Sequence, residues 1–260
     1  MKNKIKNYWN SRAKEFKLLP TATTRDIYLR EIEAAKLIKV LHKLNLPRNT
    51  RILDVGCGDG VSVLKLAKEF PFFKFTGIDY SKNMIENARK HLGLNPNKNV
   101  SFKVVDIINL KNNVKYDIIL SDRCLINLNS LELQRTAVNN IAKCLNIDGY
   151  YIAIENFVEG NDNLNSIRRF LGLPDIQIRW HNLFFCEENF LDIAKDLFNS
   201  IRFIDFLSSY YILTRAIYSK ACQIFNKVPD NSHWCHRVAR LFPSIGKCCP
   251  VRMVIAKKEK

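Results

Sequence analysis

One short stretch of the chain has the residue types of a ligand-binding turn: Asp54-Val55-Gly56-Cys57-Gly58-Asp59-Gly60. Apolar residues before it predict a strand, and apolar residues at helical spacing after it predict a helix. Three glycines at alternate positions allow the backbone to turn sharply and to approach a ligand closely. The stretch therefore predicts a binding site at the junction of a strand and a helix, with an acidic residue where the strand ends.

The spacing of the glycines separates this turn from two common phosphate-binding turns. A dinucleotide site has the pattern G-x-G-x-x-G, and here Gly56 and Gly58 fit it but Val61 occupies the third glycine position. A P-loop is excluded because no Gly-Lys-Ser/Thr follows. Asp54 suits a ligand with a cationic amine better than a pyrophosphate. We therefore expect a ligand without a pyrophosphate group.

Two more carboxylates stand at the ends of the next two expected strands. Asp79 follows Gly58 by 21 residues, where a carboxylate can accept hydrogen bonds from both hydroxyls of a ribose. Asp106 ends the third strand. Open α/β sheets bind ligands beyond the carboxyl ends of their strands, so Asp54, Asp79 and Asp106 are expected to converge on one crevice.

The elements that position these residues alternate along the middle of the chain. Short apolar runs predict strands at residues 51–55, 73–78, 100–105, 116–120 and 150–154, and amphipathic stretches predict helices near 60–69, 82–92 and 130–145. Strands that alternate with helices indicate a parallel sheet that is covered on both faces.

The flanking segments complete the expected architecture. Two helices are predicted at 3–16 and 25–45, the second capped by Thr24, and a turn-rich break at 159–163 is expected to lead into a helix at 163–171. A helix at 187–198 and strands at 201–207 and 251–256 follow. The segment 208–250 is too long for a hairpin loop, so it is either an insertion with its own structure or a functional lid.

Taken together, the glycine turn and the ordered acids closely resemble the class I S-adenosylmethionine-dependent methyltransferases. The stretch 54–60 matches that family's first motif, Asp79 its ribose-binding acid, and Asp106 the acid that accepts from the adenine amine. Leu145-Asn146-Ile147-Asp148-Gly149-Tyr150 is similar to the family's leucine–x–proline–glycine–glycine turn, although it lacks the proline and one glycine. The resemblance covers roughly residues 50–156.

The resemblance implies a three-layer, Rossmann-like α/β fold of seven strands with the last one antiparallel. Residues 1–50 would form an N-terminal helical cap and residues 51–260 the methyltransferase domain. Within that domain, 51–156 would carry the core motifs, 157–250 the acceptor side and a helical insertion or lid, and 251–257 the final strand.

The resemblance also implies S-adenosylmethionine as the cofactor. The N-terminal Tyr8-Trp9-Asn10-Ser11-Arg12 is similar to a segment that family members fold over the cofactor, so Arg12 and Arg30 would meet the methionine carboxylate or an anionic acceptor. The expected cofactor-binding residues are Asp54, Gly56, Cys57, Gly58, Asp79, Tyr80, Asp106, Ile107, Ser121 and Arg12.

A hydroxyl acceptor needs a general base, and two residues are candidates for catalysis. His181 lies in the irregular region after the fifth strand, and Glu155 ends that strand, where it could instead pair with Arg123. The expected acceptor-side residues are Arg123, Asn127, Asn156 and Trp180. The Asp/Asn-Pro-Pro-aromatic motif of the amino-directed nucleic-acid methyltransferases is missing after the fourth strand. Cys124 lacks the neighbouring proline of the RNA cytosine-C5 enzymes, so both classes are disfavoured.

Three short stretches of sequence indicate which class of acceptor to expect. Residues 123–128, 180–183 and 210–215 resemble methyltransferases that are encoded near bacterial surface-polysaccharide genes. The resemblance implies a sugar hydroxyl on a small or glycan acceptor. Two alternatives stay open: an RNA methyltransferase whose basic ends bind phosphates, and a cofactor-binding partner protein without catalysis.

The charge of the 260-residue chain sits at its two ends. Residues 1–50 and 201–260 each carry a net charge of +8, and residues 51–200 are neutral, which gives +16 in all. Such ends favour an anionic acceptor, RNA or an acidic membrane surface, so peripheral membrane contact is a further hypothesis. No apolar stretch predicts a transmembrane helix or a signal peptide.

The cysteines and histidines complete the sequence-based expectations. Eight scattered cysteines fit a reducing cytoplasm better than a disulfide framework. The cluster of His233, Cys235, His236, Cys248 and Cys249 matches no zinc spacing, so no metal site is expected.

Overall fold

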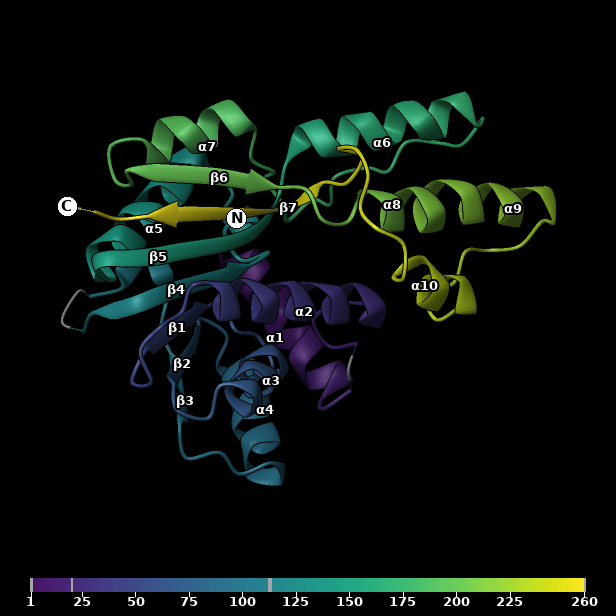
Figure 1. Ribbon diagram of the computed structural model, residues 1–260. Helices are drawn as coiled ribbons and strands as arrows, with labels where there is room; N and C mark the ends of the chain where they lie inside the picture. The colour runs from purple at the N-terminus through teal and green to yellow at the C-terminus, as the bar shows by residue number, and fades with distance from the viewer. Residues whose placement is uncertain (1, 20, 112–113, 260) are drawn as a thin grey trace.

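A single seven-stranded sheet forms the centre of the computed structural model, which describes residues 2–19, 21–111 and 114–259 (Figure 1). Its strands run in the order β3-β2-β1-β4-β5-β7-β6, and β7 is antiparallel to both of its neighbours. This confirms the expected seven-stranded fold with its antiparallel last strand. The strands are β1 (Arg51–Val55), β2 (Lys74–Asp79), β3 (Val100–Val104), β4 (Tyr116–Asp122), β5 (Leu145–Asn156), β6 (Ser200–Ile204) and β7 (Val251–Lys257).

Helices cover both faces of the sheet. The helices outside the last insertion are α1 (Lys2–Phe16), α2 (Ile27–Lys43), α3 (Val61–Glu69), α4 (Lys82–Leu94), α5 (Leu131–Cys144), α6 (Val158–Phe170) and α7 (Glu187–Ala194), with 3₁₀ turns η1 (Ile107–Asn109) and η2 (Leu125–Asn127). Residues of α2, α3, α4 and α6 share one hydrophobic cluster, whereas residues of α5 and α7 share the other.

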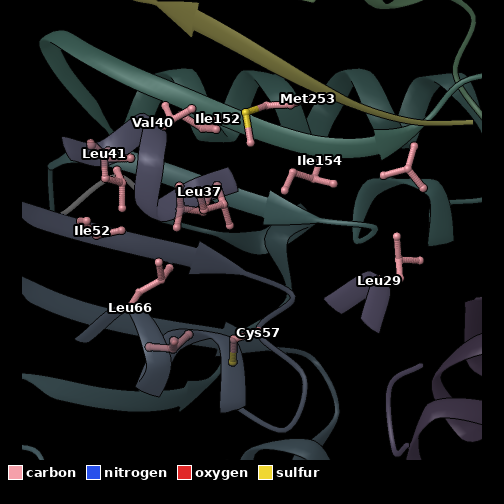
Figure 2. Packing of buried hydrophobic residues seen from close by; sticks show 14 of the residues in the cluster. Leu29, Leu37, Val40, Leu41, Ile52, Cys57, Leu66, Ile152, Ile154 and Met253 are labelled. Atoms are coloured by element: carbon pink, nitrogen blue, oxygen red, sulfur yellow. The ribbon is translucent and has the colours of Figure 1, made fainter. Parts of the chain in front are cut away.

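The period of two along the strands explains why both faces are buried. Ile52 and Ile118 belong to the first cluster, and their neighbours Leu53 and Ile119 belong to the second. All four are fully buried. Figure 2 shows part of the first cluster, where side chains of α2 meet Ile52, Ile152 and other residues of the sheet. A run of consecutive apolar residues is therefore what a strand with helices on both sides requires.

The two N-terminal helices have different positions. Residues Leu37, Val40 and Leu41 of α2 pack into the core cluster of the sheet, so this helix is part of the layered fold. Helix α1 lies against α4 instead, where Asn87 donates to the carbonyl oxygens of Ala13 and Lys17 over 2.9 and 3.0 Å. The segment expected to be one helical cap thus has one covering helix and one core helix.

Two local expectations are corrected by the structure. The N-cap of α2 is Asp26, whose side chain accepts from the Leu29 amide, while Thr24 accepts from the Asp26 amide. Residues 159–163 are not a turn but the first part of α6. Gly160 favours a turn when only the sequence is considered. In the structure it allows close packing inside the helix, because a Cβ there would lie 2.5 Å from the carbonyl carbon of Cys249.

The segment 208–250 is a helical insertion before the last strand, as the sequence predicts. It contains α8 (Ser208–Tyr211), a π-helical stretch η3 (Ile212–Ile217), α9 (Tyr218–Ile224) and α10 (Trp234–Ala239). It projects beyond the sheet beside α2 and α6 (Figure 1). Within the described residues, no group of three or more His, Cys, Asp or Glu side chains is arranged to hold a metal ion.

The insertion is joined to α2 by a buried polar network around Asp26. The Tyr210 hydroxyl donates to both carboxylate oxygens of Asp26 at 2.8 Å and lies 3.0 Å from Nδ1 of His236. Arg215 forms an ion pair with the same carboxylate. His236 is therefore part of this network.

None of the helices in the described ranges has the length and apolar character that crossing a bilayer requires. All eight cysteines are free thiols.

Candidate active site

A cavity of about 860 Å³ opens at the carboxyl ends of β1 and β4. The strand order reverses between these two strands, since the chain moves outward from β1 to β2 and β3 and then returns to β4. Such a switch point leaves a crevice because the connections leave the sheet in opposite directions. The ends of β1, β2 and β4, together with the segment after β3, line the cavity, as do α1, the start of α2 and the last insertion.

The glycine turn after β1 forms the floor of this cavity. Gly56, Gly58 and Gly60 have φ values of 72°, 54° and 75°, which L-residues with side chains rarely adopt. A Cβ at Gly58 would lie 2.8 Å from the Thr23 methyl group, and one at Gly56 would overlap Cys124. The turn therefore requires glycine for its conformation and for its close neighbours.

Asp79 is held in place by the backbone on both sides of it. Its Oδ2 accepts from the Gly58 amide at 3.1 Å, and its Oδ1 accepts from the Ser81 amide at 2.8 Å. Burial raises the pKa of Asp79 to about 6, although the two amides act in the opposite direction. The carboxylate lines the cavity with lone pairs left to accept from a ligand's hydroxyl groups.

Asp54 adds a second buried carboxyl group to the cavity. Burial raises its pKa well above the usual value, and the nearby charges of Asp122 and Asp79 raise it further. Arg30 acts in the opposite direction. Because several carboxylates meet here with little solvent, a cationic ligand would stabilise their ionised forms.

Asp106 lines the cavity just after β3, where its Oδ1 accepts from the Ile108 amide at 3.1 Å and caps η1. Ile107 and Tyr80 line the same part, and so does Cys57 from the glycine turn. The structure thus brings the three expected strand-end acids to one cavity.

Helix α1 lies over the cavity and contributes Tyr8, Trp9 and Arg12 to its lining. It is fixed at several points. The Trp9 indole donates to Oδ1 of Asn127 at 3.1 Å, and the Ser81 hydroxyl donates to Asn10 at 2.6 Å. Arg12 donates to the carbonyl oxygens of Thr21 and Ala22. The N-terminal segment therefore restricts the access of water to the crevice.

His181 lines the cavity beneath this helix. Its ring stacks on Tyr8, with centroids 4.6 Å apart, and makes edge contacts with Trp9 and Trp180. Burial lowers the pKa of His181 to about 4, and the charges of Arg179 and Arg12 lower it further. The imidazole is therefore neutral near pH 7, and its Nδ1 is a buried polar atom without a partner among the described residues.

The expected acceptor-side residues also line the cavity. Arg123, Asn127, Asn156 and Trp180 all do so, and Oδ1 of buried Asn156 has no partner among the described residues. Arg123 pairs with Glu33 at 2.7 Å and with Asp122 at 3.1 Å. The alternative that Glu155 holds Arg123 is therefore wrong.

Two expected site residues are not in the lining of the cavity. Glu155 is fully buried and accepts from the Ser121 hydroxyl and from the amides of residues 124–126. Burial raises its pKa to about 7. Ser121 also contacts the Tyr151 hydroxyl at 2.9 Å. We correct both assignments: these side chains fix the turn after β4 from behind and do not reach the cavity.

Several cavity residues lie beyond the reach of the sequence motifs. Tyr211, Arg215 and Ser219 line it from the insertion, and Arg168 and Asn161 line it from α6. Arg168 is buried, and its partners among the described residues are the carbonyl oxygens of Pro174 and Arg215. Arg168 lies on a helix with many polar residues, so nothing in the local sequence predicts that its side chain lines the cavity.

The cavity has the features that a nucleoside with a cationic amino-acid part requires. The Asp79 carboxylate can accept from two hydroxyls, the buried Asp54 can pair with an ammonium group, and Asp106 stands at the third strand end. The glycine turn leaves no room for side chains between them. The donor and acceptor groups therefore fit S-adenosylmethionine better than a dinucleotide.

Comparison with known families gives a match over the part of the chain that contains β1 to β5. Residues 46–169 match the family model described as "Methyltransferase domain". The match begins before β1 and ends in α6, so it includes the glycine turn and the three strand-end acids.

Among curated relatives, human "EEF1A lysine methyltransferase 2" is 28% identical over 135 residues, which are 50% of this chain and 57% of that protein. "Malonyl-[acyl-carrier protein] O-methyltransferase 1" of Ilyobacter polytropus is 31% identical over 147 residues, 56% of this chain and 52% of that one. The chain thus spans about half the length of the curated relatives it matches.

The fold as a whole resembles solved structures. Magnesium protoporphyrin IX methyltransferase from Synechocystis PCC 6803, solved with bound SAH, has a TM-score of 0.62 at 16% identity, with 99% of each chain covered. The YcgJ protein of Bacillus subtilis has a TM-score of 0.56 at 16% identity, covering 87% of this chain and 98% of that one. At this identity the likeness concerns the fold alone.

Proposed function

We propose that this chain is a class I S-adenosylmethionine-dependent methyltransferase that transfers a methyl group to an oxygen atom of an anionic small-molecule or glycan acceptor. Its residues 46–169 match the family model described as "Methyltransferase domain". The observation that carries the methyltransferase part is the convergence of Asp54, Asp79 and Asp106 on the cavity beside the glycine turn. The acceptor class is supported by the other end of the same cavity.

The cofactor would be held by the residues of the first three strand ends. Asp79 would accept from the ribose hydroxyls, Asp54 would face the ammonium group, and Asp106 would accept from the adenine amine. Gly56 and Gly58 allow the backbone to approach it. When bound, S-adenosylmethionine supplies a methyl group that is activated by the positively charged sulfur.

The remaining residues would position the acceptor and exclude water. Methyl transfer is an in-line displacement, so alignment of the acceptor supplies much of the catalysis. Helix α1 covers the crevice through Trp9 and Tyr8. His181 lines the cavity and is neutral because burial lowers its pKa to about 4, so a ring nitrogen would accept the proton of the attacking hydroxyl and afterwards release it to water.

The charge of the acceptor end supports an anionic acceptor over a lysine side chain. Arg25, Arg168 and Arg179 line the cavity without a carboxylate within ion-pair distance among the described residues. The acid at this end, Asp26, is already paired with Arg215. A cationic amine would be repelled here, whereas a phosphate or carboxylate would be bound.

Amide side chains at this end support a hydroxyl-rich acceptor. Asn156, Asn161, Gln177 and Asn231 line the cavity beside the arginines, and each amide can both donate to and accept from a hydroxyl group. Combined with the strings that resemble surface-polysaccharide methyltransferases, this favours a sugar that carries an anionic group. A nucleotide sugar or a phosphate-linked glycan has that chemistry.

Cofactor binding is the first test. Asp79→Ala should weaken the affinity for S-adenosylhomocysteine at least tenfold in calorimetry, because two hydroxyl acceptors are lost. Lys82→Ala, an exposed neighbour, is the control and should bind like the parent. The affinity of the parent chain should also fall as pH decreases through about 6, because protonation of Asp79 removes acceptor sites. Unchanged binding by Asp79→Ala contradicts the cofactor site.

A methyl-transfer screen tests the acceptor. With labelled S-adenosylmethionine, we expect label in nucleotide sugars or phosphate-linked glycans, and Arg168→Gln should lower kcat/KM for the labelled acceptor while leaving cofactor affinity unchanged. Label in bulk RNA or in a protein lysine contradicts the acceptor class. Tight cofactor binding with no transfer to any pool favours the non-catalytic alternative.

A further inference from the structure

The last insertion carries an unusual share of the molecule's exposed apolar surface. Twenty large apolar side chains of the described residues are exposed, and nine of them lie within residues 217–245. Among these are Phe225 at 71%, Val228 at 88% and Trp234 at 67% exposure. Single exposed apolar residues are ordinary, but a concentrated group of this kind marks an interaction surface. We call the exposed apolar residues of 217–245 the insertion surface.

The surface continues onto the end of a neighbouring helix. Phe170, the last residue of α6, is 90% exposed, and Gln223 of α9 donates to the carbonyl oxygen of Gly172 just beyond it. In Figure 1, the end of α6 and helices α9 and α10 lie together on the side of the molecule that projects away from the sheet.

Basic residues are interleaved with these apolar residues. Residues 208–250 hold six Lys or Arg and a single acid, Asp230. Lys227, Arg237 and Lys247 are exposed and have no ion-pair partner among the described residues. The surface therefore combines apolar side chains with an excess of positive charge.

The insertion has polar and apolar contacts on its inner side and further apolar side chains on its outer side. Tyr210 and His236 bond within the network around Asp26, whereas Tyr211, Ala216 and Ala239 pack into the hydrophobic core cluster. Its outer side chains include Leu241, Phe242 and Ile245, all exposed. Because polar bonds to Asp26 and apolar contacts with the core cluster both fix the inner side of the insertion, the apolar groups on its outer side remain exposed.

We infer that the insertion surface docks the protein on an anionic lipid bilayer, with Phe225, Trp234 and Leu241 entering the interface and Lys227, Arg237 and Lys247 facing lipid phosphates. Apolar side chains that include Trp, mixed with cations, suit the boundary between head groups and acyl chains. Each basic residue near such a surface adds attraction that is screened by salt.

A second copy of this chain fits the surface less well. Two copies related by a twofold axis would present the same patch to each other, so the cations of one would face those of the other. Like charges across an interface without acids between them oppose association. Anionic lipid supplies the missing negative charge.

Vesicle flotation of the full-length chain tests the inference without any need for cofactor or acceptor, so its outcome is independent of the proposed function. The chain should float with vesicles of phosphatidylcholine that contain phosphatidylglycerol, bind phosphatidylcholine alone at least tenfold more weakly, and be released by high salt. Trp234 fluorescence should shift to the blue on binding, and Trp234→Phe should lose that shift.

Matched variants separate the apolar and charged contributions. Leu241→Glu/Phe242→Glu should weaken flotation at least tenfold, while Leu94→Glu/Ile147→Glu, which alters equally exposed residues elsewhere, should not. Lys227→Gln/Arg237→Gln/Lys247→Gln should reduce the salt-sensitive part, and Lys65→Gln/Lys68→Gln/Lys74→Gln is its control for net charge. Circular dichroism checks that each variant is folded.

Two outcomes would overturn the inference. One is a folded parent chain that does not float with anionic vesicles at low salt, or that floats equally well after Leu241→Glu/Phe242→Glu. The other is a dimer in sedimentation that this double variant dissociates while flotation stays absent, which would make the surface a protein interface instead.

Discussion

At the scale of single residues, His181 and Glu155 are both buried but have different roles in the structure. Both are buried, and both were candidates for a general base. The carboxylate of Glu155 accepts from one hydroxyl and three amides, so its acceptor sites are occupied by the turn after β4. His181 keeps Nδ1 without a partner and lines the cavity. Of these two residues, the histidine lines the cavity where the acceptor would bind, and the glutamate does not.

The residue-scale prediction concerns this histidine. With the acceptor found by the transfer screen, His181→Ala should lower kcat about 100-fold or more, the usual effect of losing a general base, with unchanged affinity for S-adenosylhomocysteine. Because burial holds the pKa of His181 near 4, its titration should not alter the rate between pH 6 and 8. Rate and affinity are measured by labelled-methyl transfer and calorimetry.

Two variants make this prediction specific. His181→Asn keeps a polar side chain beside Tyr8 and should be as slow as His181→Ala if proton transfer is what is lost. Ile178→Ala, an exposed neighbour that does not line the cavity, should retain most of the activity. A fully active His181→Ala chain would remove the histidine from the mechanism.

At the scale of elements, two glycines in helices have contrasting surroundings. Gly160 lies in α6 against the backbone of Cys249 and Pro250, just before β7. Gly93 lies near the end of α4, and an added Cβ would have no atom within 4 Å. The first glycine permits a close approach between helix and backbone, whereas the second only weakens its helix.

This contrast predicts opposite effects of the same substitution. Gly160→Ala should destabilise the fold by about 2 kcal/mol or more, since backbone atoms must move to admit the methyl group. Gly93→Ala should stabilise it by up to about 1 kcal/mol, from helix propensity. Urea unfolding followed by circular dichroism measures both. Equal effects of the two substitutions would mean that α6 can shift freely away from the segment before β7.

At the scale of the whole molecule, Asp26 joins the insertion to the layered fold. Burial acts to raise its pKa, but the His236 ring and the charge of Arg215 outweigh it and hold the pKa of Asp26 at about 2. A carboxyl group whose pKa is lower in the folded than in the unfolded chain stabilises the fold at pH values above its unfolded pKa of about 4. That stabilisation, about 2 kcal/mol, is lost as pH falls through about 2.

Removing this carboxylate should release the insertion. Asp26→Asn should speed tryptic cleavage at residues 220–240 several-fold and lose the part of the acid-dependent stability that Asp26 supplies, while the sheet stays protected. Glu31→Gln is the matched control, because its ion pair with Arg240 is exposed and should contribute little. Peptide mapping after brief proteolysis measures the difference. Equal cleavage of both variants would mean that other contacts fix the insertion.

The order of the elements and the cofactor end of the site could be predicted from sequence because their signals are local. Strand periodicity, the glycine turn and the acids at strand ends lie within a few residues of each other, and the sheet's topology then brings Asp54, Asp79 and Asp106 together. The turn predicted around Gly160 is wrong for the opposite reason. The glycine is needed for a contact with residue 249, which is far along the chain, and no local pattern indicates that contact.

What only the tertiary structure decided is the acceptor end and the outer surface. Tyr210 bonds to Asp26 across 184 residues, and Arg168 bonds to a carbonyl 47 residues away. No spacing along the chain encodes such pairs. The basic ends are evident from composition, but only the packing of the insertion against Asp26 and the core cluster leaves nine of its apolar residues exposed beside its cations. Sequence periodicity determines which residues form strands and helices, whereas long-range packing determines which side chains line the cavity and which remain exposed to a partner.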